Sequence, residues 1–237
     1  MESLLTLTVG EYRSVELTLR ITVALVGMVA LLLALSTACV ASRFRFPLCL
    51  AAVALGGAGW FESGVWQAWR AGFELAGTSY CVSGQLLAGE DRIIAWCLGV
   101  PALLVAFGLL QLPDEKKPLG ILCWTALGVA VIGPFYDVIA VIGFLICWRQ
   151  LRVLLQASPS GAFRAETHVA LASILLGMLL TELGHFHLLT LGKSADTLLV
   201  HGEIFQSLTD ILYLAVPAAC LLIGAIKIPE GKPSGRS

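Results

Sequence analysis

Charged residues are scarce in this sequence. Asp, Glu, Lys and Arg make up 13% of its 237 residues, and hydrophobic residues make up 58%. Soluble domains carry about 25% charged residues, and one of this length could not bury so much apolar surface, so part of the solvent must be lipid. The net charge is −1 and no strongly basic stretch occurs, which argues against nucleic acid as a partner.

Motifs for catalysis and metal binding are also missing. The seven cysteines form no CxxC pair, and all but Cys81 lie in apolar runs, where they behave as small hydrophobes. The sequence contains no HExxH motif, no phosphate-binding glycine loop and no serine or cysteine beside an activating partner. We therefore expect neither an enzyme nor a catalytic metal site.

The most prominent feature of the sequence is a series of long apolar runs. Each run is near the length of about 20 residues that a helix needs to cross the hydrocarbon core. The Gly133-Pro134 turn signal favours two spans over one long helix between Pro118 and Trp148. The predicted spans are Ile21–Ala41, Pro47–Trp69, Ile93–Leu112, Pro118–Phe135, Val138–Ala157, Thr167–Thr190 and Ile204–Ile226.

The distribution of basic residues predicts the orientation of these spans. With the N-terminus outside, ten of the 15 Lys and Arg residues lie on the inner side and five on the outer side, as the positive-inside rule requires. The sequence thus predicts an all-α membrane protein, a seven-helix bundle with its N-terminus outside and its C-terminus inside. Residues 1–228 form this domain, 229–237 form a short disordered tail, and the outer connection 70–90 is a candidate hairpin over the mouth of the bundle.

Four charged residues fall at membrane depth: Glu62, Arg92, Glu182 and Asp210. A charge at this depth costs about 2.5–3.5 kcal/mol on insertion scales, so each is a candidate functional residue. Arg92 and Asp210 both lie near the outer half of the bundle, where they could form an ion pair. The alternative is that Arg92 reaches the outer interface while Asp210 is protonated or bonded to a hydroxyl.

The third span resembles the third helix of microbial rhodopsins, in which Arg-Tyr-x-Asp-Trp precedes Pro-Leu-Leu. Arg92, Trp96 and Pro101 match that pattern at the right spacing, and Gly64-Val65-Trp66 looks like the proteorhodopsin branch. The segment from Glu203 to Asp210 resembles the start of the family's seventh helix, which carries its second counterion. The resemblance implies the opsin fold and, by analogy with bacterial rhodopsins, the bacterial inner membrane.

The departures from the family bear directly on function. Its opsins hold retinal through a lysine four residues after the seventh-helix Asp, where this chain has Leu214. Leucine has no amine, so no Schiff base can form there. Ala95 stands at the primary counterion position and can neither balance nor accept a proton. The family's Trp-x-x-Tyr-Pro motif, whose aromatic rings enclose the retinal, is replaced by Met178, Thr181 and Glu182.

A second polar group is predicted at the outer ends of the last two spans. It contains Glu182, His185, His201 and Glu203. Carboxylates and imidazoles there could bind zinc or relay protons. The alternative, which the sequence favours, is a set of interfacial polar residues at the water boundary.

Three classes of function remain open for such a lysine-less relative of the rhodopsins. The first is a structural or interaction subunit in a membrane complex, as a homo-oligomer or with other membrane proteins. The second is non-covalent binding of a retinoid, carotenoid or lipid in the bundle interior, and the third is a light-independent channel or transporter. The predicted interior pocket comprises Arg92, Ala95, Trp96, Gly99, Met178, Thr181, Asp210 and Leu214.

The missing amine gives a direct prediction. Retinal mixed with the purified protein and treated with borohydride under illumination will leave no retinyl group on the polypeptide, because all five lysines lie in loops, at span ends or in the tail. Intact-protein mass spectrometry measures this. A mass increase of one retinyl group would contradict the prediction.

Overall fold

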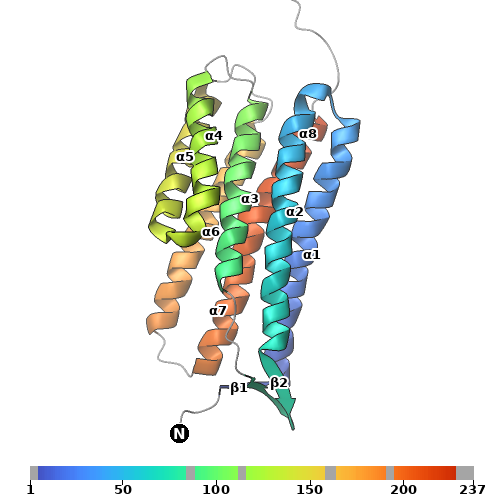
Figure 1. Ribbon diagram of the computed structural model, residues 1–237, viewed down its shortest axis with the longest axis vertical. Coiled ribbons are helices and arrows are strands. Elements are labelled where there is room, and N and C mark those ends of the chain that lie inside the picture. The colour runs from blue at the N-terminus through green and yellow to red at the C-terminus, as the bar shows by residue number, and fades with distance from the viewer. Residues whose placement is uncertain (1–4, 84–88, 112–115, 158–163, 191–194, 228–237) are drawn as a thin grey trace, which may run out of the picture.

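Long helices running side by side form nearly the whole molecule (Figure 1). The computed structural model describes residues 5–83, 89–111, 116–157, 164–190 and 195–227, with the side chains of residues 89, 137, 157, 182–190 and 195 outside that description. The predicted tail 229–237 also lies outside the described residues. The helices are α1 Val9–Cys39, α2 Ser42–Ala71, α3 Gly89–Leu110, α4 Lys116–Ile132, α5 Asp137–Ala157, α6 Arg164–Thr190, α7 Ala195–Asp210 and α8 Val216–Lys227.

The last crossing of the bundle is one continuous helix with a change of winding. A π-helical turn, η3 (Ile211–Ala215), joins α7 to α8, and its flanking residues Asp210 and Val216 both keep right-handed helical angles. A π-turn holds one more residue than an α-turn, so it rotates the side chains that follow it. The described chain therefore crosses the bundle seven times, which confirms the predicted all-α, seven-helix fold.

Six of these crossings are long and apolar enough to span a membrane within the described part of the chain. They are Val9–Cys39, Ser42–Ala71, Glu90–Leu110, Lys116–Phe135, Val138–Gln156 and Asp196–Lys227. The seventh, α6, begins with Arg164 and Glu166, and the side chains of its last turns are not described. A short 3-10 turn, η1 (Gly133–Phe135), separates α4 from α5, so two spans rather than one long helix occupy this segment.

α1 begins earlier than the sequence indicated, at Val9 instead of Ile21. The reason is local. Thr8 caps the helix by accepting a hydrogen bond from the Glu11 backbone at 3.2 Å, while the Glu11 carboxylate accepts one from the Thr8 backbone at 2.9 Å. This capping box satisfies two amides at the helix start. At 31 residues, α1 is about 46 Å long and so exceeds the hydrocarbon core.

A three-stranded antiparallel sheet lies at one end of the bundle, which we call the hairpin end (Figure 1). β2 (Phe73–Ala76) and β3 (Ser79–Val82) form the predicted hairpin, and the tight turn between them needs the positive φ of 66° at Gly77. β1 (Thr6–Thr8) pairs with the other edge of β3. The sequence did not indicate this third strand.

Aromatic side chains fix the sheet to the helices beneath it. Tyr12 of α1 stacks on Tyr80 at 3.8 Å and on Trp69 of α2 at 5.7 Å between ring centroids, and Phe73 meets Tyr12 edge-on. These rings form a core cluster with residues of α1, α2 and α7. The hairpin end is therefore closed by a packed lid over three helices.

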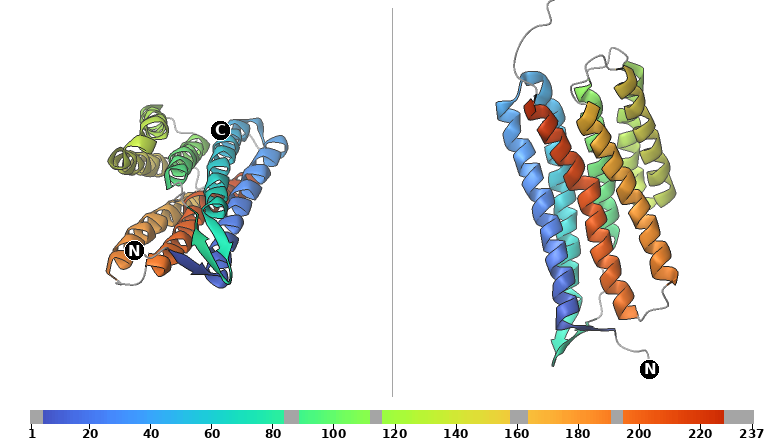
Figure 2. Two further views of the ribbon diagram at one scale, coloured as in Figure 1. Left: turned by 60° about the horizontal axis from the view of Figure 1, so that its bottom comes forward. Right: turned by 180° about the vertical axis from the view of Figure 1, so that it is seen from behind.

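The helices are not packed evenly. α3 is central and contacts α2, α4 and α5, whereas α5 packs on α3 and α4 and makes little contact with α6 in the described residues. Figure 2 shows α3, α4 and α5 as one group, with α6 and α7 to one side of it. The boundary between α5 and α6 is consequently loosely packed in the described residues.

The close contact of α4 and α5 depends on a glycine. A Cβ built at Gly143 would lie 2.1 Å from Cγ2 of the buried Val129, whose branched side chain has little freedom to move. We expect Gly143→Ala to lower the free energy of unfolding by about 1–3 kcal/mol. Thermal unfolding in detergent, followed by circular dichroism, measures the loss.

Gly128→Ala is the matched control on α4. Nothing lies within 4 Å of its added Cβ, so this change should be neutral or stabilise the helix by up to about 1 kcal/mol. Equal losses in the two variants would show that helix packing at Gly143 is not the cause.

Candidate functional site

A buried ionic network joins α3 to α7 in the half of the bundle nearer the hairpin end. Nε of Arg92 donates to Asp210 Oδ2 at 3.0 Å, and both Nη atoms donate to Glu203 Oε2 at 3.2 Å. Gln206 also accepts a hydrogen bond from Nη1. Arg92 is 3% exposed and Asp210 is fully buried, so the structure shows the interior ion pair and not the interfacial alternative.

Trp96 extends this network, which we call the Arg92 network, toward the middle of the bundle. Its indole Nε1 donates to Asp210 Oδ1 at 2.6 Å, and its ring lies 5.1 Å from that of Tyr213, at 57°. Both Asp210 oxygens are thereby occupied, one by a cation and one by a neutral donor. Charge-assisted bonds of this kind are the strong ones in a protein interior.

Glu62 of α2 adds another acidic group beside the network. It is 1% exposed, and neither of its carboxyl oxygens has a hydrogen-bond partner within the described residues. Asp210, Arg92 and Glu203 are the charged groups that act on it. Sequence reasoning identified Glu62 as a charge at membrane depth but not as a neighbour of Asp210, because the two residues lie on different helices.

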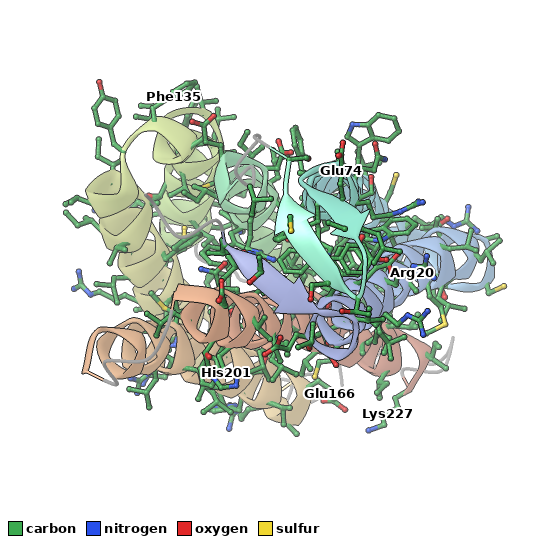
Figure 3. All side chains as sticks on the ribbon, turned by 90° about the horizontal axis from the view of Figure 1, so that it is seen from below. Arg20, Glu74, Phe135, Glu166, His201 and Lys227 are labelled. Carbon is green, nitrogen blue, oxygen red and sulfur yellow. The ribbon has the colours of Figure 1, made fainter. Side chains whose placement is uncertain are left out.

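The predicted outer polar cluster is not a single site in the described residues. Glu203 turns inward and binds Arg92, whereas His201, two residues earlier, is exposed at the edge of α7 (Figure 3). Residues two apart on a helix point to different sides. The side chains of Glu182 and His185 lie outside the described residues, and the described ones contain no group of three potential ligands that could hold a metal ion.

A cavity of about 680 Å³ lies beside the Arg92 network, between α3, α5, α6 and the last crossing. Most of its wall is apolar, and its polar groups come from Arg92, Trp96, Thr181, Gln206 and Tyr213. The remaining lining residues are Ile93, Cys97, Val100, Ala140, Val141, Phe144, Ile174 and Met178. No lysine is among them.

The structure divides the predicted pocket residues into two groups. Arg92, Trp96, Met178 and Thr181 line the cavity. The others do not, which corrects the expected frame of the pocket. Ala95 and Asp210 are fully buried in the packing beside it, and Gly99 and Leu214 are packed against each other.

Leu214 faces α3 and α2 rather than the cavity. A Cβ at Gly99 would lie 2.3 Å from Leu214 Cδ2 and 3.5 Å from Cβ of Ala58. The preceding residue, Tyr213, lies within the π-turn and lines the cavity, where its ring also packs against Gly177. Sequence reasoning missed Tyr213 because it took Leu214 as the pocket residue from the family's spacing after the seventh-helix Asp.

Comparison with solved structures identifies the fold. Xanthorhodopsin, a light-driven ion pump with dual chromophore, is 20% identical, with a TM-score of 0.77 over 94% of this chain and 96% of that one. Thermophilic rhodopsin is 18% identical, with a TM-score of 0.78 over the same shares. Blue light-absorbing proteorhodopsin from Med12 is 16% identical, with a TM-score of 0.57 over 90% of this chain and 98% of that one.

No protein-family model and no curated protein sequence matches this chain. The likeness is therefore one of structure. The chain is a membrane-spanning helical protein with the rhodopsin fold, and its activity has to be inferred from the residues of its own interior.

The Arg92 network leads to a stability prediction. Arg92→Gln leaves Asp210 and Glu203 buried without a cation, which should cost about 3–5 kcal/mol in the free energy of unfolding. Arg70→Gln makes the same chemical change at a side chain that is 57% exposed and lies 3.7 Å from Glu16, where about 1 kcal/mol or less is expected. Chemical unfolding in detergent measures both values, and similar losses would show that the network does not hold α3 to α7.

Proposed function

We propose that this protein binds an elongated, largely apolar molecule non-covalently in the cavity between α3, α5, α6 and η3, and that it is not a light-driven pump. The observation that carries the proposal is the cavity itself. Its volume of about 680 Å³ lies within the range of about 300–1,000 Å³ that small-molecule sites occupy. A retinoid, one end of a carotenoid or a lipid chain fits this chemistry.

The wall chemistry favours a ligand with one neutral polar end. Arg92, at one end of the α3 lining, already has two carboxylate partners, so it has little charge to offer an anionic ligand. The hydroxyls of Thr181 and Tyr213 lie 3.5 Å apart and both line the cavity. An alcohol or carbonyl would find donors and acceptors there. From Arg92 to Val100 the α3 lining extends about 12 Å along the helix axis.

The residues that line the cavity do not include the amine that a retinal-based light-driven pump needs. A covalent imine needs an amine in the cavity, and none of the lining residues is a lysine. The described lysines, Lys116, Lys117 and Lys227, are all exposed at helix ends. Ala95, at the position where the family has its proton acceptor, carries no ionisable group. A bound chromophore would therefore be held by shape and apolar contact.

The composition of the half of the bundle away from the hairpin end is evidence against a channel. The buried Asp, Glu and Arg residues of the described chain, Glu62, Arg92, Glu203 and Asp210, all belong to the other half. Mostly apolar side chains, such as Leu103, Phe107 and Leu154, fill the remainder. A charged path across such a core would be expensive.

All-trans-retinol tests the proposal, because its alcohol cannot form an imine. We expect retinol to co-elute with the purified wild-type protein and to dissociate in organic solvent. Met178→Trp, which fills the cavity, should weaken binding about tenfold or more, a loss of about 1.4 kcal/mol. Retinol fluorescence in a titration measures the affinity.

Leu179→Trp is the matched control, since Leu179 is the next residue on α6 and is 56% exposed on the outer surface. It should bind retinol like the wild type. Equal weakening in both variants would contradict binding in the cavity. A wild-type protein that neither binds retinol nor carries an endogenous ligand in its mass spectrum, but co-purifies with a stoichiometric partner, would replace this proposal with the interaction subunit.

A further inference from the structure

A buried acid lies beside the Arg92 network without a donor of its own. Glu62 of α2 is 1% exposed, and both of its carboxyl oxygens are buried with no hydrogen-bond partner among the residues that the structure describes. Nearly all buried polar atoms in proteins have a partner, and an ionised carboxylate without one is strongly disfavoured. The Glu62 carboxyl group must therefore be neutral or have a cation beside it.

The charged groups that face Glu62 are mostly negative. α7 contributes Asp210 and Glu203, and α3 contributes Arg92. Asp91 of α3, whose carboxylate lies against α2 two residues further along, adds another acid. Arg92 already donates to both carboxylates of α7, so these three groups have a formal charge of −1. Ionised Glu62 would bring that charge to −2, and carboxylates that share a buried site bind a proton between them.

The other elements that pack against α2 bring no cation to Glu62. These elements are α1, α8 and β2. Arg20, the last charged residue of α1, and Lys227, the one charged residue of α8, have side chains that are 53% and 64% exposed, and each pairs with an acid at the surface. Glu74, the one charged residue of β2, is exposed. In the described part of the chain, Arg92 is therefore the one cation that faces Glu62.

The bonding of Asp210 leaves room for a proton. Its two oxygens each accept one hydrogen bond, from Arg92 and from Trp96, although a carboxylate oxygen can accept two. The Glu62 carboxyl group lies within reach of Asp210. Two carboxylates can only accept hydrogen bonds, so this pair can form a hydrogen bond only when one of the two carries a proton.

We propose that Glu62 and Asp210 share one proton at neutral pH, and that the pair is a proton-binding site between α2 and α7. Protonated Glu62 donates to Asp210, which keeps its negative charge for Arg92. Loss of the proton to the buffer would leave a carboxylate that competes with Asp210 and Glu203 for the one guanidinium. Trp96 binds Asp210 and lines the central cavity, so it connects the pair to the cavity wall. The proton would be held whether or not the cavity is occupied.

A metal ion is the other means of neutralising Glu62. Hard cations such as Ca²⁺ and Mg²⁺ need about six oxygen ligands. The described side chains contain no group of three His, Cys, Asp or Glu residues that could hold a metal ion, and both oxygens of Asp210 already accept hydrogen bonds. A proton needs only the two carboxyl groups, so the arrangement favours a proton.

Infrared spectroscopy of the full-length protein in detergent tests the proposal. A protonated carboxyl group has a C=O stretching band that carboxylates lack. We expect this band in the wild type at neutral pH and its loss in Glu62→Gln. Glu74→Gln is the matched control, because it makes the same change at an exposed side chain, and it should keep the band. A wild type without the band, or an unchanged band in Glu62→Gln, would overturn the proposal.

The pH dependence of unfolding gives a second measurement. The unfolded chain releases the Glu62 proton above about pH 5, in the usual range for glutamate, whereas the folded protein should keep it. Because the folded state then binds one more proton, the unfolding constant of the wild type relative to that of Glu62→Gln should rise about tenfold per pH unit from about pH 5 to about pH 7. Stability from this site is thus lost as the pH rises. A constant or falling ratio would refute the shared proton.

The same ratio distinguishes a proton from a metal ion. Replacement of sodium by choline at constant pH and ionic strength should leave the ratio of the two unfolding constants unchanged, because a proton site has no need of sodium. A ratio that depends on sodium would identify a metal cation beside Glu62 and would overturn the proposal.

Discussion

The guanidinium of Arg92, held between Glu203 and Asp210, is the interaction on which the interior of this protein depends. It fixes α3 against α7 at a depth where an unpaired charge would cost several kcal/mol. Trp96 then binds the second oxygen of Asp210 and presents its ring to Tyr213. Because these polar groups bond to one another, the cavity beside them keeps a mostly apolar wall. The same network therefore also bears on the chemistry of the ligand that we propose for the cavity.

The two halves of the bundle differ in the type of side chain that they bury. The half near the sheet holds the buried Asp, Glu and Arg residues that the structure describes, under a lid of stacked aromatic rings. The other half is filled mostly by apolar side chains, with the buried polar pair Gln111 and Thr167. In a pump or channel, protons or ions would have to cross both halves. The non-covalent binding that we propose needs only one cavity in a stable bundle, and this asymmetric interior has both.

The packing of α5 bears on the position of the central cavity. α5 follows α3 and α4, partly because Gly143 lets α4 approach it closely, and leaves α6 at a distance. The central cavity lies along this boundary, between α3, α5, α6 and the last crossing.

The sequence by itself determined the class of the protein. Apolar runs of fixed length allow only a helical bundle in a membrane, since every backbone amide must be paired within its own helix. Arg92 and Asp210 were recognisable because charge is costly at their depth, and the positions of the five lysines predicted that none enters the interior. The tertiary structure decided which side chains meet. Tyr213, and not Leu214, lies on the cavity wall, and Glu203 binds Arg92 instead of joining the outer cluster. Glu62 lies beside Asp210. Such contacts join distant segments, and they depend on helix rotation and spacing, which no local pattern of residues encodes.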